Sequence, residues 1–209
     1  MVDLHMTDTS GHNTPGPATV TDRTQHLDSR SASGPGPGDH TVDVGLLILR
    51  LGIGAAILQA GLIKATDFSM TVQFMTDAGW RLPAFAAFMV TATETVSGVA
   101  LLLGVLSPLA GCAALGSMLC AWAVNVSGAA FWSEPFNVPF LMGLGGAALL
   151  FAGAGAYSVD SRLLARLYWS PRVKLALLGL ALVAAIVTWV ALYGVNPIHF
   201  TAPQAPAGM

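Results

Sequence analysis

The chain has 209 residues, of which 54% are hydrophobic and only 10% are charged. A soluble domain has about 25% charged residues, so this composition argues against a soluble enzyme. The formal net charge of −2 provides no basic surface that would neutralise phosphates, which argues against nucleic acid as a partner.

The first 43 residues are polar and rich in Gly, Pro and Ser, with almost no large apolar side chain. A segment of this composition cannot bury enough apolar surface to offset the entropy lost on ordering. It also lacks the apolar core of a secretory signal peptide. We therefore predict a disordered tail over residues 1–43.

Five apolar runs follow, each close to the ~20 residues that a helix needs to cross the ~30 Å hydrocarbon core of a bilayer. A lipid-exposed segment must satisfy its own backbone hydrogen bonds, which favours helix. The expected spans are Val44–Ile63, Leu82–Leu106, Leu109–Phe131, Phe136–Tyr157 and Val173–Val195. The sequence thus predicts an all-α fold, a polytopic membrane bundle of five helices, in which the lipid bilayer is the first partner.

Positive charges predict the orientation of this bundle. The connection between the fourth and fifth spans carries Arg162, Arg166, Arg172 and Lys174, whereas the connection between the third and fourth carries none. By the positive-inside rule the former connection is cytoplasmic. The N-terminal tail is then cytoplasmic as well, and the C-terminal tail, residues 196–209, is extracytoplasmic.

Histidine and cysteine offer no metal site inside the predicted spans. All five histidines lie outside them, which rules out a bis-histidine haem and removes the usual imidazole ligands for an intramembrane metal. Cys112 and Cys120 are eight residues apart in one predicted helix, about 12 Å of rise, which exceeds the reach of a disulfide. We expect two free thiols and no bound metal.

Among the polar residues inside the predicted spans, Arg50, Gln59, Glu94 and Asn125 are the ones to explain. An ionisable group there costs at least ~2.5 kcal/mol, so it usually faces the protein interior. Small residues share the helix faces of Arg50 and Glu94, which indicates that both point inward. We predict that these two form an intramembrane polar pair. The alternative is that Arg50 reaches the inner head groups and a protonated Glu94 is hydrogen-bonded within its own helix.

Gln59 and Asn125 are interpreted as interhelical hydrogen-bonding residues. The connection between the first two spans holds Lys64, Asp67, Asp77 and Arg81, which are expected as solvated loop residues. Lys64 differs from the others because it continues the helix face of Arg50 to the membrane interface. We predict that Lys64 contacts an anionic or quinone-like head group.

Three segments together resemble the DoxX family of small bacterial and archaeal membrane proteins. They are VGLLILRLGIGAAILQAGLIKATDF, TETVSGVALLLGVLSPLAG and FAGAGAYSVDSRL. The resemblance implies a four-helix core over residues 44–163, with Arg50, Lys64, Glu94 and Asp160 at matching positions. The chain departs from the family by its long tail and by residues 164–195, a basic cytoplasmic linker and a fifth helix.

The resemblance also implies redox chemistry in the bacterial plasma membrane. Archaeal relatives belong to thiosulfate:quinone oxidoreductase, and mycobacterial relatives belong to an oxidoreductase complex with superoxide dismutase and a sulfurtransferase. We therefore expect a membrane subunit of a quinone-linked or oxidative-stress oxidoreductase complex, with protein partners and no catalysis alone. The residues themselves predict no cofactor. The resemblance to the family allows a quinone as cofactor.

Two other functions stay open. The first is an assembly or anchoring subunit without chemistry of its own. The second, weaker alternative is a small-solute or proton transporter, against which stand the short chain and the absence of a detectable pair of inverted repeats.

Overall fold

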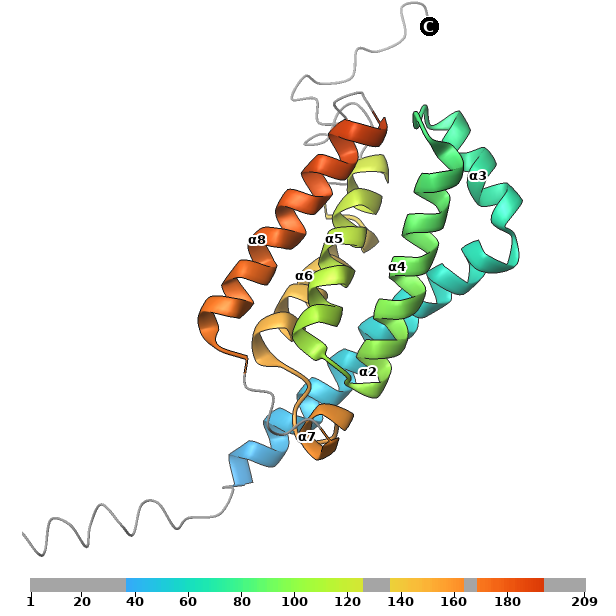
Figure 1. The fold of residues 1–209 in the computed structure, drawn as a ribbon. Coiled ribbons are helices and arrows are strands. Elements are labelled where there is room, and N and C mark those ends of the chain that lie inside the picture. The colour runs from blue at the N-terminus through green and yellow to red at the C-terminus, as the bar shows by residue number, and fades with distance from the viewer. Residues whose placement is uncertain (1–36, 126–135, 164–168, 194–209) are drawn as a thin grey trace, which may run out of the picture. The chain divides into compact units, whose positions relative to one another are not determined.

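The computed structural model describes residues 37–125, 136–163 and 169–193 (Figure 1). The chain divides at Gly38, and the bundle belongs to the unit that starts at Asp39. Every element in the described ranges is helical, which confirms the all-α prediction. The order is α2 (Pro37–Thr66), α3 (Phe68–Asp77), α4 (Pro83–Leu103), α5 (Ser107–Asn125), α6 (Val138–Ala152), α7 (Val159–Leu163), α8 (Pro171–Thr188) and a π-helical turn, η1 (Trp189–Tyr193).

Four of the described helices are long and apolar enough to cross a membrane: His40–Thr66, Pro83–Leu103, Ser107–Asn125 and Pro171–Leu192. Large apolar side chains on them are exposed, such as Ile48 at 65% and Val96 at 68%, as lipid-facing residues are. The chain is a multi-pass membrane protein. Helix α6 is also apolar, but its 15 residues extend only about 22 Å.

Helix boundaries differ from the predicted spans at two places. Helix α2 begins at Pro37, within the segment expected to be a disordered tail, of which residues 1–36 lie outside the described residues. Helix α6 ends at Ala152 rather than Tyr157, because Gly153 and Gly155 have φ values of +82° and +72°. Residues 126–131 of the expected third span, the linker residues 164–168 and the C-terminal tail also lie outside the described residues.

The connection between the first two spans is not a simple loop, and that expectation was wrong. Most of it forms α3, whose first turn is capped by Asp67, because the Asp67 carboxylate accepts a hydrogen bond from the backbone N–H of Met70 at 3.1 Å. Thr71 and Met75 of α3 are buried, whereas Met70 is exposed. Ten residues are too few to span a bilayer, so a search for apolar runs passes over this helix.

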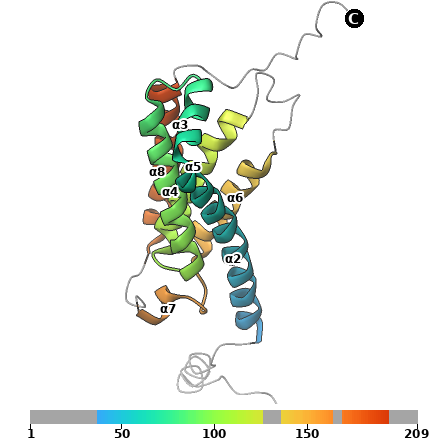
Figure 2. The same ribbon diagram turned by 90° about the vertical axis from the view of Figure 1, so that its right-hand side faces the viewer.

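Helix α5 is the centre of the bundle, with 56% of its apolar span buried against 17% for α8. In Figure 1 α5 lies between α4 and α8, and the turned view in Figure 2 shows that α5 is set back from both. Its other side packs closely on α6, since a Cβ added to Gly111 would lie only 2.6 Å from the carbonyl oxygen of Gly146. Glycine at position 111 therefore permits the contact between α5 and α6.

Helices α2 and α4 cross in close contact, and glycines set their register. A Cβ on Gly61 would lie 2.7 Å from the backbone nitrogen of Thr95, and a Cβ on Gly98 would lie 2.6 Å from the backbone nitrogen of Leu58. The two helices are antiparallel, so residues further back along α2 lie beside residues further on along α4. This register places Glu94 at the level of the last turns of α2.

Candidate functional site

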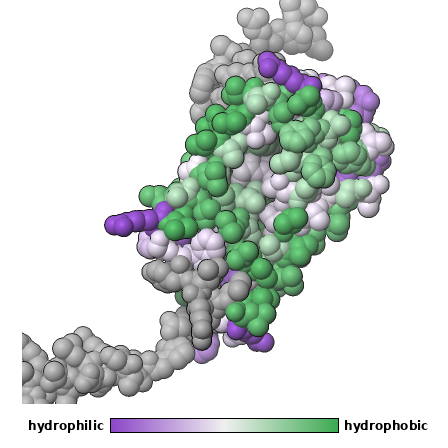
Figure 3. Space-filling model, in the orientation of Figure 1, coloured by the Kyte–Doolittle hydropathy of each residue, from purple (hydrophilic) through white to green (hydrophobic). Residues whose placement is uncertain are grey.

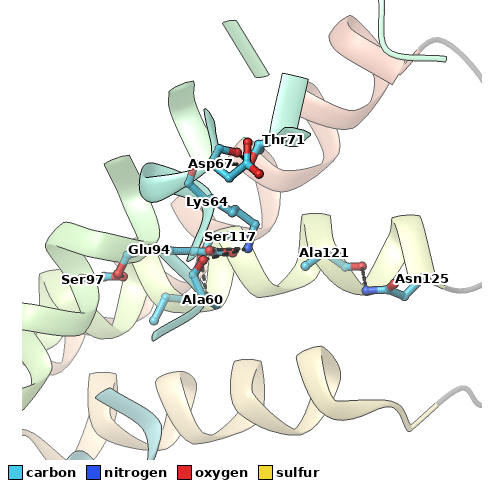
Figure 4. A network of polar contacts seen from close by, with 10 residues as sticks. Ala60, Lys64, Asp67, Thr71, Glu94, Ser97, Ser117, Ala121 and Asn125 are labelled. Atoms are coloured by element: carbon cyan, nitrogen blue, oxygen red, sulfur yellow. Dashed lines mark hydrogen bonds and ion pairs between the residues drawn. The ribbon is translucent and has the colours of Figure 1, made fainter. Parts of the chain in front are cut away.

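Lys64 and Glu94 form an ion pair inside the bundle. Lys64 Nζ lies 2.7 Å from Glu94 Oε2, and it is also 3.4 Å from the carbonyl oxygen of Ala60 (Figure 4). Glu94 is only 1% exposed, whereas the Lys64 side chain is 29% exposed. The pair joins the last turn of α2 to the middle of α4. A buried carboxylate is costly unless a positive charge compensates it, and Lys64 provides that charge.

Arg50 does not pair with Glu94, which corrects the predicted intramembrane polar pair. Its guanidinium donates from Nη1 to the carbonyl oxygen of Ala154 at 2.8 Å and from Nη2 to that of Tyr157 at 2.6 Å. The register of α2 and α4 explains the difference, because Glu94 lies level with residues about twelve positions after Arg50, roughly 18 Å along the helix. The inward direction predicted for both side chains is confirmed, since Arg50 is 2% exposed.

Asp160 binds the turn between α4 and α5. Its Oδ1 accepts from the N–H of Leu106 at 2.7 Å, and its Oδ2 accepts from the N–H and the hydroxyl of Ser107 at 2.9 Å each. Leu106 has a φ of +47°, a conformation that side-chain-bearing residues rarely adopt. Asp160 therefore stabilises a strained turn and lies apart from the pair of Lys64 and Glu94.

Gln59 and Asn125 do not act as interhelical hydrogen-bonding residues in the described part of the chain. The Asn125 amide donates to the carbonyl oxygen of Ala121 in its own helix at 2.9 Å. Gln59 is exposed, and on the same face a Cβ added to Gly45 or Gly52 would meet no atom within 4 Å. The face of α2 that carries Gly45, Gly52 and Gln59 is thus open.

A cavity of about 550 Å³ lies beside the ion pair, a volume in the range of small-molecule sites. Its back wall is α5 and its sides are α4 and α8, with α3 and Trp80 at one end. The residues that line it on α5 are Cys112, Ala113, Gly116, Ser117, Cys120, Ala121, Val124 and Asn125. Figure 3 shows this face as a paler area between the greener side chains of α8 and α4, because small residues with weak hydropathy line it.

Both cysteines are free, as expected, and both line the cavity. Each points its sulfur at a backbone carbonyl of α8: Cys112 Sγ lies 3.2 Å from the oxygen of Leu177, and Cys120 Sγ lies 3.9 Å from that of Ala185. Small residues at every fourth position of α5 thus let α8 approach closely. Sequence reasoning found the thiols but missed the cavity, whose only local signal is the four-residue spacing of Cys112, Gly116 and Cys120.

The ion pair offers a ligand one donor and one acceptor. Lys64 uses Nζ to bind Oε2 of Glu94, and no described residue donates a hydrogen bond to the other carboxylate oxygen, Oε1. Because the two charges cancel, an anionic head group would bring an uncompensated charge into an apolar cavity, which is unfavourable. A neutral head group with carbonyl or hydroxyl oxygens fits this arrangement better. Among the described residues, no three His, Cys, Asp or Glu side chains cluster as metal ligands.

Comparison with known proteins gives one match. Residues 45–132 match the DoxX family, a segment that holds most of α2 and all of α3, α4 and α5. No curated protein and no solved structure matches the chain. The match includes Arg50, Lys64 and Glu94, whereas Asp160 and α8 lie beyond it. The match over residues 45–132 supports membership in the DoxX family.

Proposed function

We propose that the chain is the integral membrane subunit of an oxidoreductase complex, and that the cavity beside Lys64 and Glu94 binds a quinone-like head group. The observation that carries this proposal is the ion pair itself, since it is the charged part of the wall of a mostly apolar cavity. A structural role alone needs no cavity at the pair. The similarity of residues 45–132 to the DoxX family supports the redox assignment, because that resemblance implies quinone-linked chemistry.

The residues present fit a quinone. Lys64 would donate to a ring carbonyl, and Glu94 Oε1 would accept from a ring hydroxyl of the reduced form, while Trp80 and Met75 would provide apolar contacts at the outer end. When bound, a quinone supplies two-electron, two-proton redox chemistry. The chain contributes a dry site and a neutral ion pair that orients the oxygens. The electron donor and its redox centres are then parts of partner proteins.

We propose the bacterial plasma membrane as the location, with the N-terminus cytoplasmic and the C-terminus outside. Helix α6 would also cross the membrane despite its length, as the fourth of five crossings, because it packs along α5 at Gly111 and Gly146. Lys174 at the start of α8 donates to the carbonyl oxygen of Phe151 at the end of α6, at 2.7 Å. Both groups would then lie at the cytoplasmic side with Arg172, as the positive-inside rule requires.

The open face of α2 favours a second role, in assembly. Gln59 lies within an apolar span, it is exposed, and no described residue gives it a hydrogen bond. An unpaired amide in hydrocarbon is unfavourable, so a partner helix that supplies a hydrogen bond would stabilise it. Gly45 and Gly52 on the same face would admit such a helix at short distance. We therefore place the partner subunit on this face of α2, away from the cavity.

Purification in a gentle detergent tests the proposal, with mass spectrometry to identify co-purifying proteins and lipids. We expect a quinone and at least one redox protein with the wild-type chain. Gln59→Leu should lose the protein partner and keep the quinone, whereas Glu94→Gln should lose the quinone and keep the partner. A wild-type chain that elutes alone and without quinone would contradict the redox assignment.

A further inference from the structure

We infer that the ligand enters the cavity sideways from the bilayer, through a mouth between α4 and α8, and that it is a neutral lipid with a single long chain. The inference deepens the proposed function of the same site, since it names the class of ligand and its route. It rests on four observations: the exposed residues of the mouth, its depth, the covered outer end, and the length of the cavity.

The mouth is marked by residues that line the cavity and are also exposed on the molecular surface. Met89 of α4 is 43% exposed and Leu180 of α8 is 57% exposed, and both line the cavity. Ala184, one turn after Leu180, is exposed and lines it too. The cavity therefore opens between the two helices, on the face that Figure 3 turns toward the viewer.

The depth of the mouth places it in hydrocarbon. Met89 lies six residues after the start of α4 at Pro83, about 9 Å along that helix. Leu180 lies nine residues after the start of α8 at Pro171, about 14 Å from the opposite end. Both positions fall well inside a layer about 30 Å thick, so a molecule at the mouth is already dissolved in the membrane.

The outer end of the cavity is covered. The N–H of Arg81 donates to the carbonyl oxygen of Leu192 at 2.6 Å, which ties the segment just before α4 to η1. Trp80 is only 7% exposed and packs in one cluster with Met75 and Leu192. A water-soluble ligand that arrived from this side would have to displace that cluster, whereas a membrane-dissolved ligand meets the mouth directly.

The cavity is long and narrow. Its lining on α5 runs from Cys112 to Asn125, which is about 20 Å of helix, and on α8 and η1 from Leu180 to Leu192, about 18 Å. A volume of about 550 Å³ over such a length is a slot that suits one extended chain. The polar pair lies along this slot and would hold the head group. Helix α8, which lies beyond the DoxX match, provides one wall and half of the mouth.

Photolabelling tests the route and the ligand class together. The full chain in phosphatidylcholine vesicles is labelled with a long-chain alcohol that carries a diazirine, and the labelled residues are mapped by mass spectrometry. We expect label on the lining residues of α5 and α8. Ala184→Trp, which narrows the mouth, should reduce that label several-fold, whereas Val183→Trp, on an exposed neighbour outside the cavity, should not. Met89→Trp narrows the mouth from α4 and should repeat the effect.

Equal labelling of the Ala184→Trp and Val183→Trp variants would overturn the inference. It would also be overturned if a diazirine phosphatidylcholine labelled the lining as strongly as the alcohol does, because bulk lipid would then fill the slot. The outcome is distinct from that of the redox proposal. If the alcohol labels the lining and no quinone co-purifies, lateral entry stands and the redox assignment fails. If quinone co-purifies equally with Ala184→Trp and Val183→Trp, the lateral mouth fails and the redox assignment stands.

Discussion

Lys64 Nζ lies 2.7 Å from Glu94 Oε2, although thirty residues separate the two in the chain. This ion pair joins α2 to α4 one turn beyond the close contact of Gly61 with Thr95. It also lies in the wall of the cavity, so the same contact bears on stability and on ligand binding.

Removal of either charge should destabilise the bundle, because the other is left uncompensated. We expect Lys64→Gln and Glu94→Gln each to lower the free energy of unfolding by about 2–3 kcal/mol. This loss is smaller than for a fully buried pair, because Lys64 is partly exposed. The double variant should lose at least about 1 kcal/mol less than the sum of the two single losses. The measurement is reversible unfolding in detergent. The matched control combines Glu94→Gln with Arg50→Gln, whose effects on the free energy of unfolding should add. If these two effects are instead coupled, Arg50 pairs with Glu94 as the sequence predicted.

The crossing of α2 and α4 should not tolerate a side chain at Gly98. Its Cβ would lie 2.6 Å from the backbone nitrogen of Leu58, so Gly98→Ala must push the helices apart, at a cost of about 1–3 kcal/mol. Gly52→Ala on the open face of α2 is the control, because a Cβ there meets no atom within 4 Å. In thermal unfolding, Gly52→Ala should be about as stable as the wild type, whereas Gly98→Ala should unfold at a lower temperature. Equal stability of the two variants would contradict the close crossing of α2 and α4.

Asp160 should matter for folding and little for ligand binding. Asp160→Asn replaces one of two accepting oxygens with a donor, which leaves an N–H or hydroxyl of the turn unpaired and costs about 1–3 kcal/mol. Asp77→Asn is the control, since Asp77 is exposed and accepts a hydrogen bond from Gln73 on the surface of α3. We expect it to change stability by less than about 0.5 kcal/mol. An Asp160→Asn chain that is stable but fails to bind ligand would give Asp160 a direct role.

Alkaline phosphatase fusions test the membrane topology, because this enzyme folds only outside the cytoplasm. A fusion after Met209 should be active and a fusion after Leu163 inactive, if α6 crosses the membrane and the chain crosses five times. Helix α6 is short, so the alternative is four crossings with both termini on one side. With a cytoplasmic N-terminus, that alternative predicts an active fusion after Leu163 and an inactive fusion after Met209, and this result would contradict the proposed orientation.

The sequence predicted the helices well, because an apolar run of membrane length has few other conformations available. It also predicted that Arg50 and Glu94 point inward, since small residues share their faces. Their partners were beyond reach, because the register of α2 on α4 is set by contacts of Gly61 and Gly98 that no single helix reveals. The cavity was missed for a similar reason, as it exists only where α8 meets α4 and α5.

The central claim is that the cavity prefers a neutral head group because Glu94 cancels the charge of Lys64. The most direct measurement compares the affinities of a neutral long-chain benzoquinone and a long-chain carboxylate for the wild-type chain and for Glu94→Gln. We predict that the wild type prefers the quinone, and that Glu94→Gln, with Lys64 uncompensated, shifts the ratio toward the carboxylate by about tenfold, or 1.4 kcal/mol. A ratio that is the same in both chains would contradict the account.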